Sequence, residues 1–188
     1  MTQISLLKST FYGNQYAESE FLTLCQAVES YHRDIQGGQY IAQSTYDKDV
    51  YPVLVGVIPT TLESSFKASL QTRLKYANEF SLRKRLTLLI QQHSYILDKR
   101  IKTTDGLASQ IADARNYLTH YTTEEKPPHP YPLNFYSTVL RSILTVSILA
   151  QMGFSSRKIV ELSERCEQLD AIKYSAPPSL WPQDATKA

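Results

Sequence analysis

The sequence has few of the residues on which small disulfide-stabilised or zinc-stabilised domains depend. Its 188 residues include two cysteines, Cys25 and Cys166, which are far apart and belong to no Cys-x-x-Cys pair or Cys/His cluster. This usage argues against a disulfide framework and against a structural zinc site. A chain of this length can bury a hydrophobic core of its own, so we expect both cysteines to be buried apolar residues.

Membrane and export signals are also lacking. No apolar stretch approaches the roughly 18 to 20 residues of a membrane span, and residues 1–10 contain no signal-peptide core or small-residue cleavage site. The composition, 42% hydrophobic and 20% charged, is unlike that of a disordered chain. These absences predict a soluble, cytoplasmic protein that does not bind membranes.

The usual catalytic motifs are absent as well. With six glycines and four histidines, the sequence contains no phosphate-binding loop, dinucleotide-binding turn, HExxH zinc helix or GxSxG nucleophile elbow. Most common nucleotide-, zinc- and serine-dependent enzyme classes are therefore excluded.

Hydrophobic spacing instead predicts helices along the first half of the chain. Apolar residues recur every three or four positions from Ala17 to Ile35, and again over residues 61–97, where a break near Asn78 separates two helices. Residues 46–59 include a short β-branched run without a partner strand, so we interpret them as a helix with Pro52 near its start.

The second half continues the helical pattern. A helix capped by residues 103–105 is expected to end near Tyr121, and a loop with four prolines follows over residues 122–132. Residues 133–152 are apolar over most of the helix circumference, which predicts a central buried helix. A last helix is expected from Ser155 or Ser156 to about Leu169. The sequence thus predicts one all-α domain, residues 1–188, with its core at about 17–170 and a tail at 171–188.

Positive charge gathers in the middle of an otherwise balanced sequence. The net charge is +2, yet residues 67–102 contain nine lysines and arginines against two acidic residues. Such an excess can follow a phosphate backbone, although solvated helix faces carry similar charges. The candidate contacts to such a phosphate backbone in this region are Arg83, Lys84, Arg85, Lys99, Arg100 and Lys102.

The main candidate for catalysis is the segment Asp113–Tyr121. In it Arg115 is followed by Asn116 and, four residues after that, by His120. Asn116 and His120 share a helix face, whereas Arg115 projects about 140° away from His120. Arg115 and His120 converge only if the helix end bends or a second subunit contributes its own pair. Spacing alone favours a structural role, with Arg115 in a salt bridge and His120 near the helix-end carbonyls.

Three segments, Ala27–Arg33, Tyr76–Leu86 and Arg115–His120, resemble in content and order the ApeA-like branch of the HEPN superfamily. The last contains the Arg-x4-His element with its adjoining asparagine, and the second contains Asn-Glu-Phe-Ser-Leu-Arg. The resemblance spans roughly residues 21–169. It implies a HEPN-like helical bundle with additional helices.

The resemblance also implies a function. HEPN domains commonly dimerise with their motifs facing each other, and many are metal-independent endoribonucleases of antiviral defence or toxin systems. Arg115, Asn116 and His120 are then expected to be catalytic without a metal ion or other cofactor. RNA, a second copy that completes a composite active site, and other domains of a longer defence protein are the expected partners. The alternative is a non-catalytic HEPN dimer that binds RNA or a protein partner.

Histidine and arginine suit this reaction because RNA carries its own nucleophile, the 2′-OH. Cleavage then needs a proton acceptor or donor and a cation that stabilises the charged transition state. His120 would move the proton, Arg115 would hold the phosphate oxygens, and Asn116 would orient the histidine or the phosphate.

Overall fold

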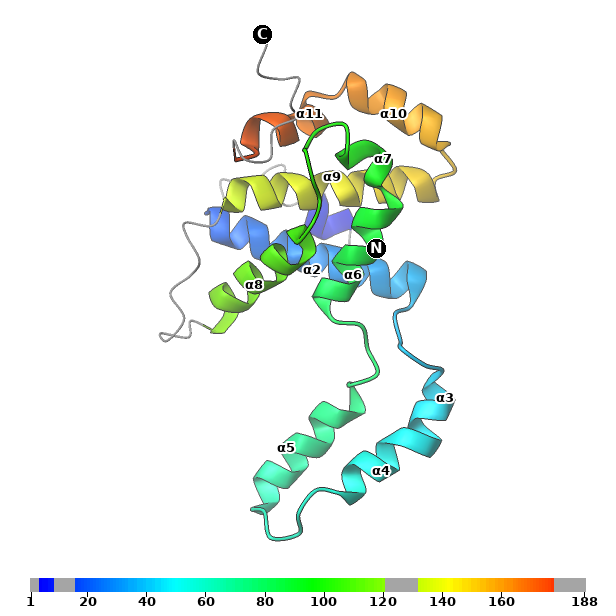
Figure 1. Cartoon of the computed structure of the whole chain (residues 1–188), viewed down its shortest axis with the longest axis vertical. Coiled ribbons are helices and arrows are strands. Elements are labelled where there is room, and N and C mark those ends of the chain that lie inside the picture. Colours follow the sequence, from blue (N-terminus) through cyan, green and yellow to red (C-terminus); the bar gives the residue numbers. More distant parts are fainter. Residues whose placement is uncertain (1–3, 9–15, 121–131, 178–188) are drawn as a thin grey trace. The chain divides into compact units, whose positions relative to one another are not determined.

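The computed structural model describes residues 4–8, 16–120 and 132–177, and helices make up most of this part of the chain (Figure 1). No strand is assigned in these ranges, where the β-type pairing is one isolated bridge between Gln39 and Glu79. The predicted all-α fold is therefore confirmed. The proline-rich segment 121–131 and Trp181 lie outside the described residues.

The chain divides into two compact units, Met1–Ile35 with Leu82–Ala188, and Gln36–Ser81. We call them the main unit and the inserted unit. The main unit contains α2 (Ala17–Gln36), α6 (Leu82–Gln92), α7 (Ser94–Leu97), α8 (Leu107–His120), α9 (Leu133–Gln151), α10 (Ser156–Glu164) and α11 (Glu167–Ser175). The inserted unit contains α3 (Gln43–Thr45), the π-helical turn η1 (Tyr46–Val50), α4 (Tyr51–Gly56) and α5 (Ser64–Lys75). No boundary at Gln36 or Ser81 was predicted, and the expectation of a single domain stays a prediction.

The core of the main unit forms around α9, which packs against α6, α10 and α11. Apolar side chains of α9 recur every three or four residues, and Val139, Leu140 and Leu144 have no exposed surface. Helix α2 contributes Phe21 and Leu24 to the same cluster. Each such side chain contributes about 1.5–3 kcal/mol through its burial, so the amphipathic pattern accounts for these two helices.

Helix α9 corrects the expectation that no apolar stretch of the chain approaches the length of a membrane span. Its 19 residues, Leu133–Gln151, are long enough and apolar enough to cross a membrane by length and composition. However, 56% of the apolar 18-residue window within this helix is buried inside the structure, as in the core helix of a folded domain. The cytoplasmic location stays a prediction.

The C-terminal region differs from the single helix expected there. Ser155 caps α10, since its Oγ accepts a hydrogen bond from the backbone N–H of Lys158 at 3.3 Å. The helix then ends near Arg165, and extended backbone at Cys166 (φ −109°, ψ 104°) starts the separate helix α11. Cys166 is half-buried instead of buried, and Ile172 belongs to the core, so the region beyond residue 171 is partly packed.

The inserted unit is a helical hairpin in which α4 contacts α5. Asn78 closes its base, because the Asn78 side chain accepts a hydrogen bond from the N–H of Ile41 at 3.1 Å and donates one to the Ile41 carbonyl at 3.0 Å. Farther from this base, the Tyr46 hydroxyl donates a hydrogen bond to the Leu74 carbonyl. The predicted helix break near Asn78 is confirmed, as is the helical state of residues 46–56 with Pro52 in the first turn of α4.

Candidate functional site

The three candidate catalytic residues lie in the last turns of α8. This helix packs through Leu107, Ile111 and Ala114, which are buried at helical spacing. The same periodicity leaves Arg115 half-buried and both Asn116 and His120 exposed. The sequence therefore places the motif at an accessible helix end.

The side chain of Arg115 makes two polar contacts in the described part of the main unit. Its Nη1 donates a hydrogen bond to Asn116 Oδ1 at 3.1 Å, and its Nη2 lies 3.8 Å from Glu29 Oε2 on α2. The Arg115 and Glu29 side chains are 33% and 24% exposed, so solvent screens their attraction only in part. Arg115 is thus held in one orientation with part of its guanidinium open to solvent.

His120 is the last residue of α8 and is exposed. Within the described ranges, no hydrogen bond or ion pair joins its imidazole to Arg115, Asn116 or any other residue. The structure therefore brings Arg115 and Asn116 together and leaves His120 apart from them within one chain. This matches the divergence of Arg115 and His120 expected from the helix geometry.

Glu29 is the residue of this site that the sequence analysis missed. It lies within the Ala27–Arg33 segment, one residue after the buried Val28. The nearby Cys25 responds to the same charges: burial is the main cause that raises the pKa of its thiol to about 12, with Glu29 adding to the rise and Arg115 opposing it. A thiol with this pKa stays protonated at neutral pH and is a poor nucleophile.

Four of the six expected RNA contacts are exposed in the main unit. Arg83 donates a hydrogen bond to Asp113 at 2.7 Å, and Lys99 lies 3.6 Å from Glu164. Lys84 and Lys102 are also exposed. RNA binding by these four residues stays a prediction.

The other two, Arg85 and Arg100, are buried, with 1% and 2% of their surface exposed. Arg85 Nη1 lies 3.1 Å from His32 Nδ1, and because arginine only donates, this nitrogen is the acceptor and His32 is neutral. Arg100 donates to the carbonyls of Ile96 and Ser163, both at 3.0 Å, and so joins α7 to the end of α10. Both guanidinium groups are buried and make their contacts inside the main unit. This removes Arg85 and Arg100 from the expected RNA-binding set.

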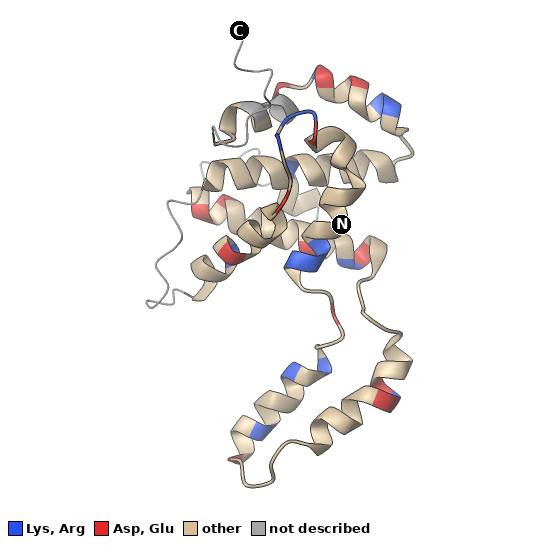
Figure 2. Cartoon of the chain, viewed as in Figure 1, with Lys and Arg blue, Asp and Glu red and all other residues tan. Residues whose placement is uncertain are grey.

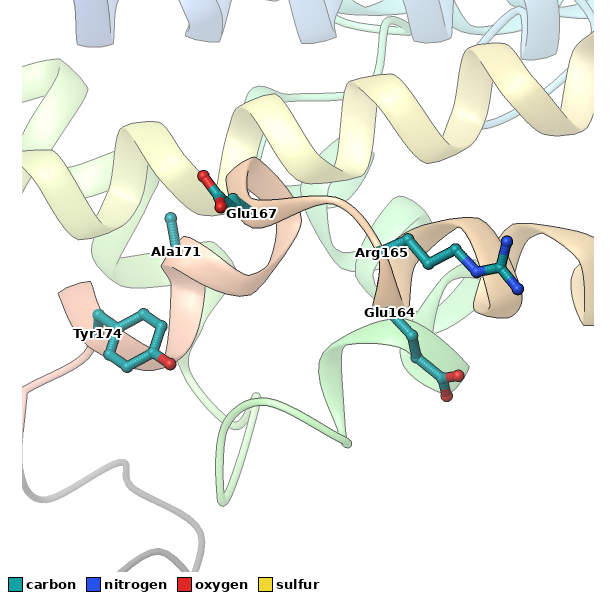
Figure 3. Close-up of a pocket in the computed structure, with 5 residues that line it drawn as sticks. All are labelled: Glu164, Arg165, Glu167, Ala171 and Tyr174. Carbon is teal, nitrogen blue, oxygen red and sulfur yellow. The ribbon is translucent and has the colours of Figure 1, made fainter.

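Two surface cavities of the main unit lie away from the motif. One of about 440 Å³ is lined by residues of the α10–α11 connection, and Figure 3 shows that its charged side chains, Glu164, Arg165 and Glu167, diverge. The other, of about 450 Å³, is bordered by Tyr31, Ile148 and Met152, among others. Neither arrangement gathers polar groups around one point, so neither suggests a small-molecule site.

Comparisons with known proteins support the resemblance to HEPN domains. No curated protein and no solved structure gives a significant match. The family model described as Apea-like HEPN matches residues 22–158, which cover most of the chain and include Glu29, Arg115, Asn116 and His120. The chain therefore belongs to the ApeA-like HEPN family.

Proposed function

We propose that the protein is a metal-independent endoribonuclease of the HEPN type that acts in antiviral defence or in a toxin-like system. The observation that carries this proposal is the position of Arg115, Asn116 and His120 at the exposed end of α8 in a member of the ApeA-like HEPN family. Family membership supports a role of the RNase and defence kind, and the three residues supply the chemistry for it.

Cleavage would start with removal of the 2′-OH proton by an imidazole. The 2′ oxygen then forms a bond to phosphorus, the bond from phosphorus to the 5′ oxygen breaks, and the leaving oxygen takes up a proton. The products are a 2′,3′-cyclic phosphate and a 5′-hydroxyl. General acid–base catalysis of this kind contributes about 10²- to 10⁴-fold in rate, and the Arg115 guanidinium would stabilise the charge on the non-bridging oxygens.

The in-line geometry of this reaction favours a homodimer. The attacking and leaving oxygens lie on opposite sides of phosphorus, so a single imidazole cannot serve both. A second copy of α8 supplies a second His120, one acting as base and the other as acid. In this composite site the Arg115 of either copy can approach the phosphate from the side.

One observation favours the alternative of a non-catalytic HEPN dimer. Arg115 already contacts Glu29 and Asn116, as an arginine with a purely structural role would. Such a protein binds RNA or a protein partner at the same surface without cleaving it.

The test is incubation of mixed RNA with purified wild type and His120→Ala in EDTA, followed by analysis of the product ends. His129→Ala, which changes the next histidine along the chain, is the matched control. Cyclic phosphate ends from wild type and from the control, but not from His120→Ala, support the nuclease. RNA binding without cleavage by all three proteins favours the non-catalytic dimer, and equal cleavage by all three rules out His120 as the catalytic group.

A further inference from the structure

The inserted unit buries few of its own side chains. Among residues 36–81, all of which are described, Tyr46 and Asn78 are the buried ones. Its other large apolar side chains are exposed or half-buried, and those of Val53, Val57 and Phe66 are exposed. Because burial of apolar surface is the main favourable contribution to folding, this hairpin gains little stability from its own packing.

The helices of the inserted unit are also short. Helix α4 has six residues and α5 has 12, and isolated helices of fewer than about 12–15 residues are marginal in water. The Glu63 carboxylate caps α5 by accepting hydrogen bonds from the N–H groups of Ser65 at 3.0 Å and Phe66 at 3.2 Å. This cap stabilises the first turn of α5 but does not join α5 to α4.

Ion pairs do not hold the two arms of the hairpin together. Helix α5 carries three basic residues and no acidic one, whereas η1 carries two aspartates on either side of Lys48 (Figure 2). No ion pair joins α5 to η1 or α4 among the described residues. The closed hairpin must therefore depend on other contacts.

Those contacts are concentrated at the base of the hairpin. Besides the two bonds between the Asn78 side chain and the backbone of Ile41, the Tyr40 N–H donates to the Asn78 carbonyl at 3.0 Å. The Phe80 N–H donates to the Gly38 carbonyl at 2.8 Å. The rings of Tyr40 and Phe80 also meet edge to face, with 4.8 Å between their centroids. Asn78, which is 3% exposed, is the buried residue of this base.

Loss of the hairpin structure takes no side chain from the core of the main unit. The two apolar clusters of that core contain no residue from 36–81. The main unit can therefore keep its packing, and with it the position of α8, when the inserted unit unfolds.

We propose that the inserted unit is a conformational switch that opens while the main unit stays folded, and that Asn78 controls its closure. In the closed state the Asn78 amide joins backbone groups 37 positions away in the sequence. In the open state these groups bond water, and α4 and α5 lose their helical structure. Such local opening costs less free energy than unfolding of the whole chain. The folded fraction of residues 36–81 is thus adjustable independently of the core.

Hydrogen exchange of the full chain, measured by mass spectrometry of its peptides, tests the proposal. Amides of α4 and α5 should exchange faster than those of α9 by about a hundredfold or more. Urea should accelerate exchange less in α5 than in α9, because opening of the hairpin exposes less surface than global unfolding does.

Substitution of Asn78 tests its control of the closure. Asn78→Ala removes both bonds to Ile41 and should accelerate exchange in α4 and α5 by about tenfold, the usual effect of leaving buried polar groups without a partner. Tyr46→Phe keeps the ring but removes the bond to Leu74 and should accelerate exchange in the same helices. Asn134→Ala, which changes an exposed asparagine of α9, is the matched control and should leave α4 and α5 unchanged.

Each other outcome overturns the proposal. Equal exchange rates and equal urea dependence in α5 and α9 would show that the chain unfolds as one cooperative unit. Acceleration of both α5 and α9 by Asn78→Ala would show that Asn78 stabilises the whole chain, and no acceleration in either would exclude its control of the hairpin. RNA takes no part in this experiment, so failure of the nuclease proposal does not imitate failure of this one.

Discussion

Arg115 on α8 and Glu29 on α2 form an ion pair that holds the guanidinium of the family motif, with 3.8 Å between Nη2 and Oε2. A carboxylate in this position offsets part of the positive charge that would otherwise attract the oxygens of a phosphate. An approaching RNA must therefore displace Glu29 from Arg115 or share the guanidinium with it. In the proposed nuclease, Glu29 would set both the orientation of Arg115 and its affinity for a phosphate group.

We predict that Glu29→Gln tightens RNA binding. The substitution keeps the side-chain size but removes the charge that competes with phosphate. A partly exposed pair of this kind is worth roughly 0–1 kcal/mol, so the dissociation constant should fall up to about fivefold. Fluorescence anisotropy with a non-cleavable 2′-O-methyl RNA measures the effect.

The matched control for this experiment is Glu20→Gln. Glu20 pairs with Arg141, is on the same helix as Glu29 and is exposed to a similar extent, but it lies outside the motif. It should leave the dissociation constant unchanged. Equal affinities of wild type and Glu29→Gln would show that Glu29 does not compete with RNA for Arg115.

Substitution of Arg85 and of its neighbour Lys84 on α6 should change the free energy of unfolding by different amounts. Arg85→Ala removes a buried side chain and leaves His32 Nδ1 without the donor seen here, which should cost about 3 kcal/mol of unfolding free energy. Lys84→Ala changes an exposed residue and should stay within about 0.5 kcal/mol of wild type. Urea unfolding compares them, and equal stabilities would contradict the core role of Arg85.

The spacing of apolar residues along the sequence predicted the helices and their buried faces. Helices α2 and α9 follow from their apolar periodicity, and the exposed end of α8 follows from the stripe through Leu107 and Ile111. The burial of Arg85 was also visible in principle, because it lies three residues after Leu82 and four before Leu89 on the buried face of α6. The prediction that Arg85 contacts RNA followed from the local positive charge and not from this spacing.

The remaining features depend on contacts between residues far apart in the chain. The pairing of Glu29 with Arg115 joins α2 to α8, and periodicity within one helix carries no information about it. The closure of the inserted unit depends on Asn78 bonding the backbone of Ile41 across the hairpin base. The break at Cys166 has no proline or glycine to mark it, so the sequence predicted one helix where there are two.

Arg115→Lys should reduce cleavage although it keeps the charge. Lysine lacks the planar fork that binds two oxygens at once, and loss of one such donor to a transition state typically costs about 10²- to 10³-fold in rate. The turnover rate should fall by about that factor. The control is Arg157→Lys, which changes an exposed arginine of α10 and should cleave RNA at the wild-type rate. Wild-type activity of Arg115→Lys would contradict the proposed role of Arg115 in binding the phosphate oxygens.

His93 should make the stability of the main unit depend on pH. Its side chain is 2% exposed, Nε2 lies 2.8 Å from Ser147 Oγ, and Nδ1 has no hydrogen-bond partner within the described residues. Burial lowers the pKa of His93 from 6.5 to about 4. Between these two values the unfolded chain binds a proton that the folded chain does not, so acidification favours unfolding.

The stabilising effect of this shift is therefore complete above pH 6.5 and is lost as the pH falls toward about 4. At pH 5 the loss should be on the order of 2 kcal/mol relative to pH 7. His93→Gln, which can still bond Ser147 but does not titrate, should lack this part of the loss, whereas His120→Gln on the surface should behave like wild type. Urea unfolding at both pH values measures the difference, and an equal loss in wild type and His93→Gln would show that another group controls the acid sensitivity.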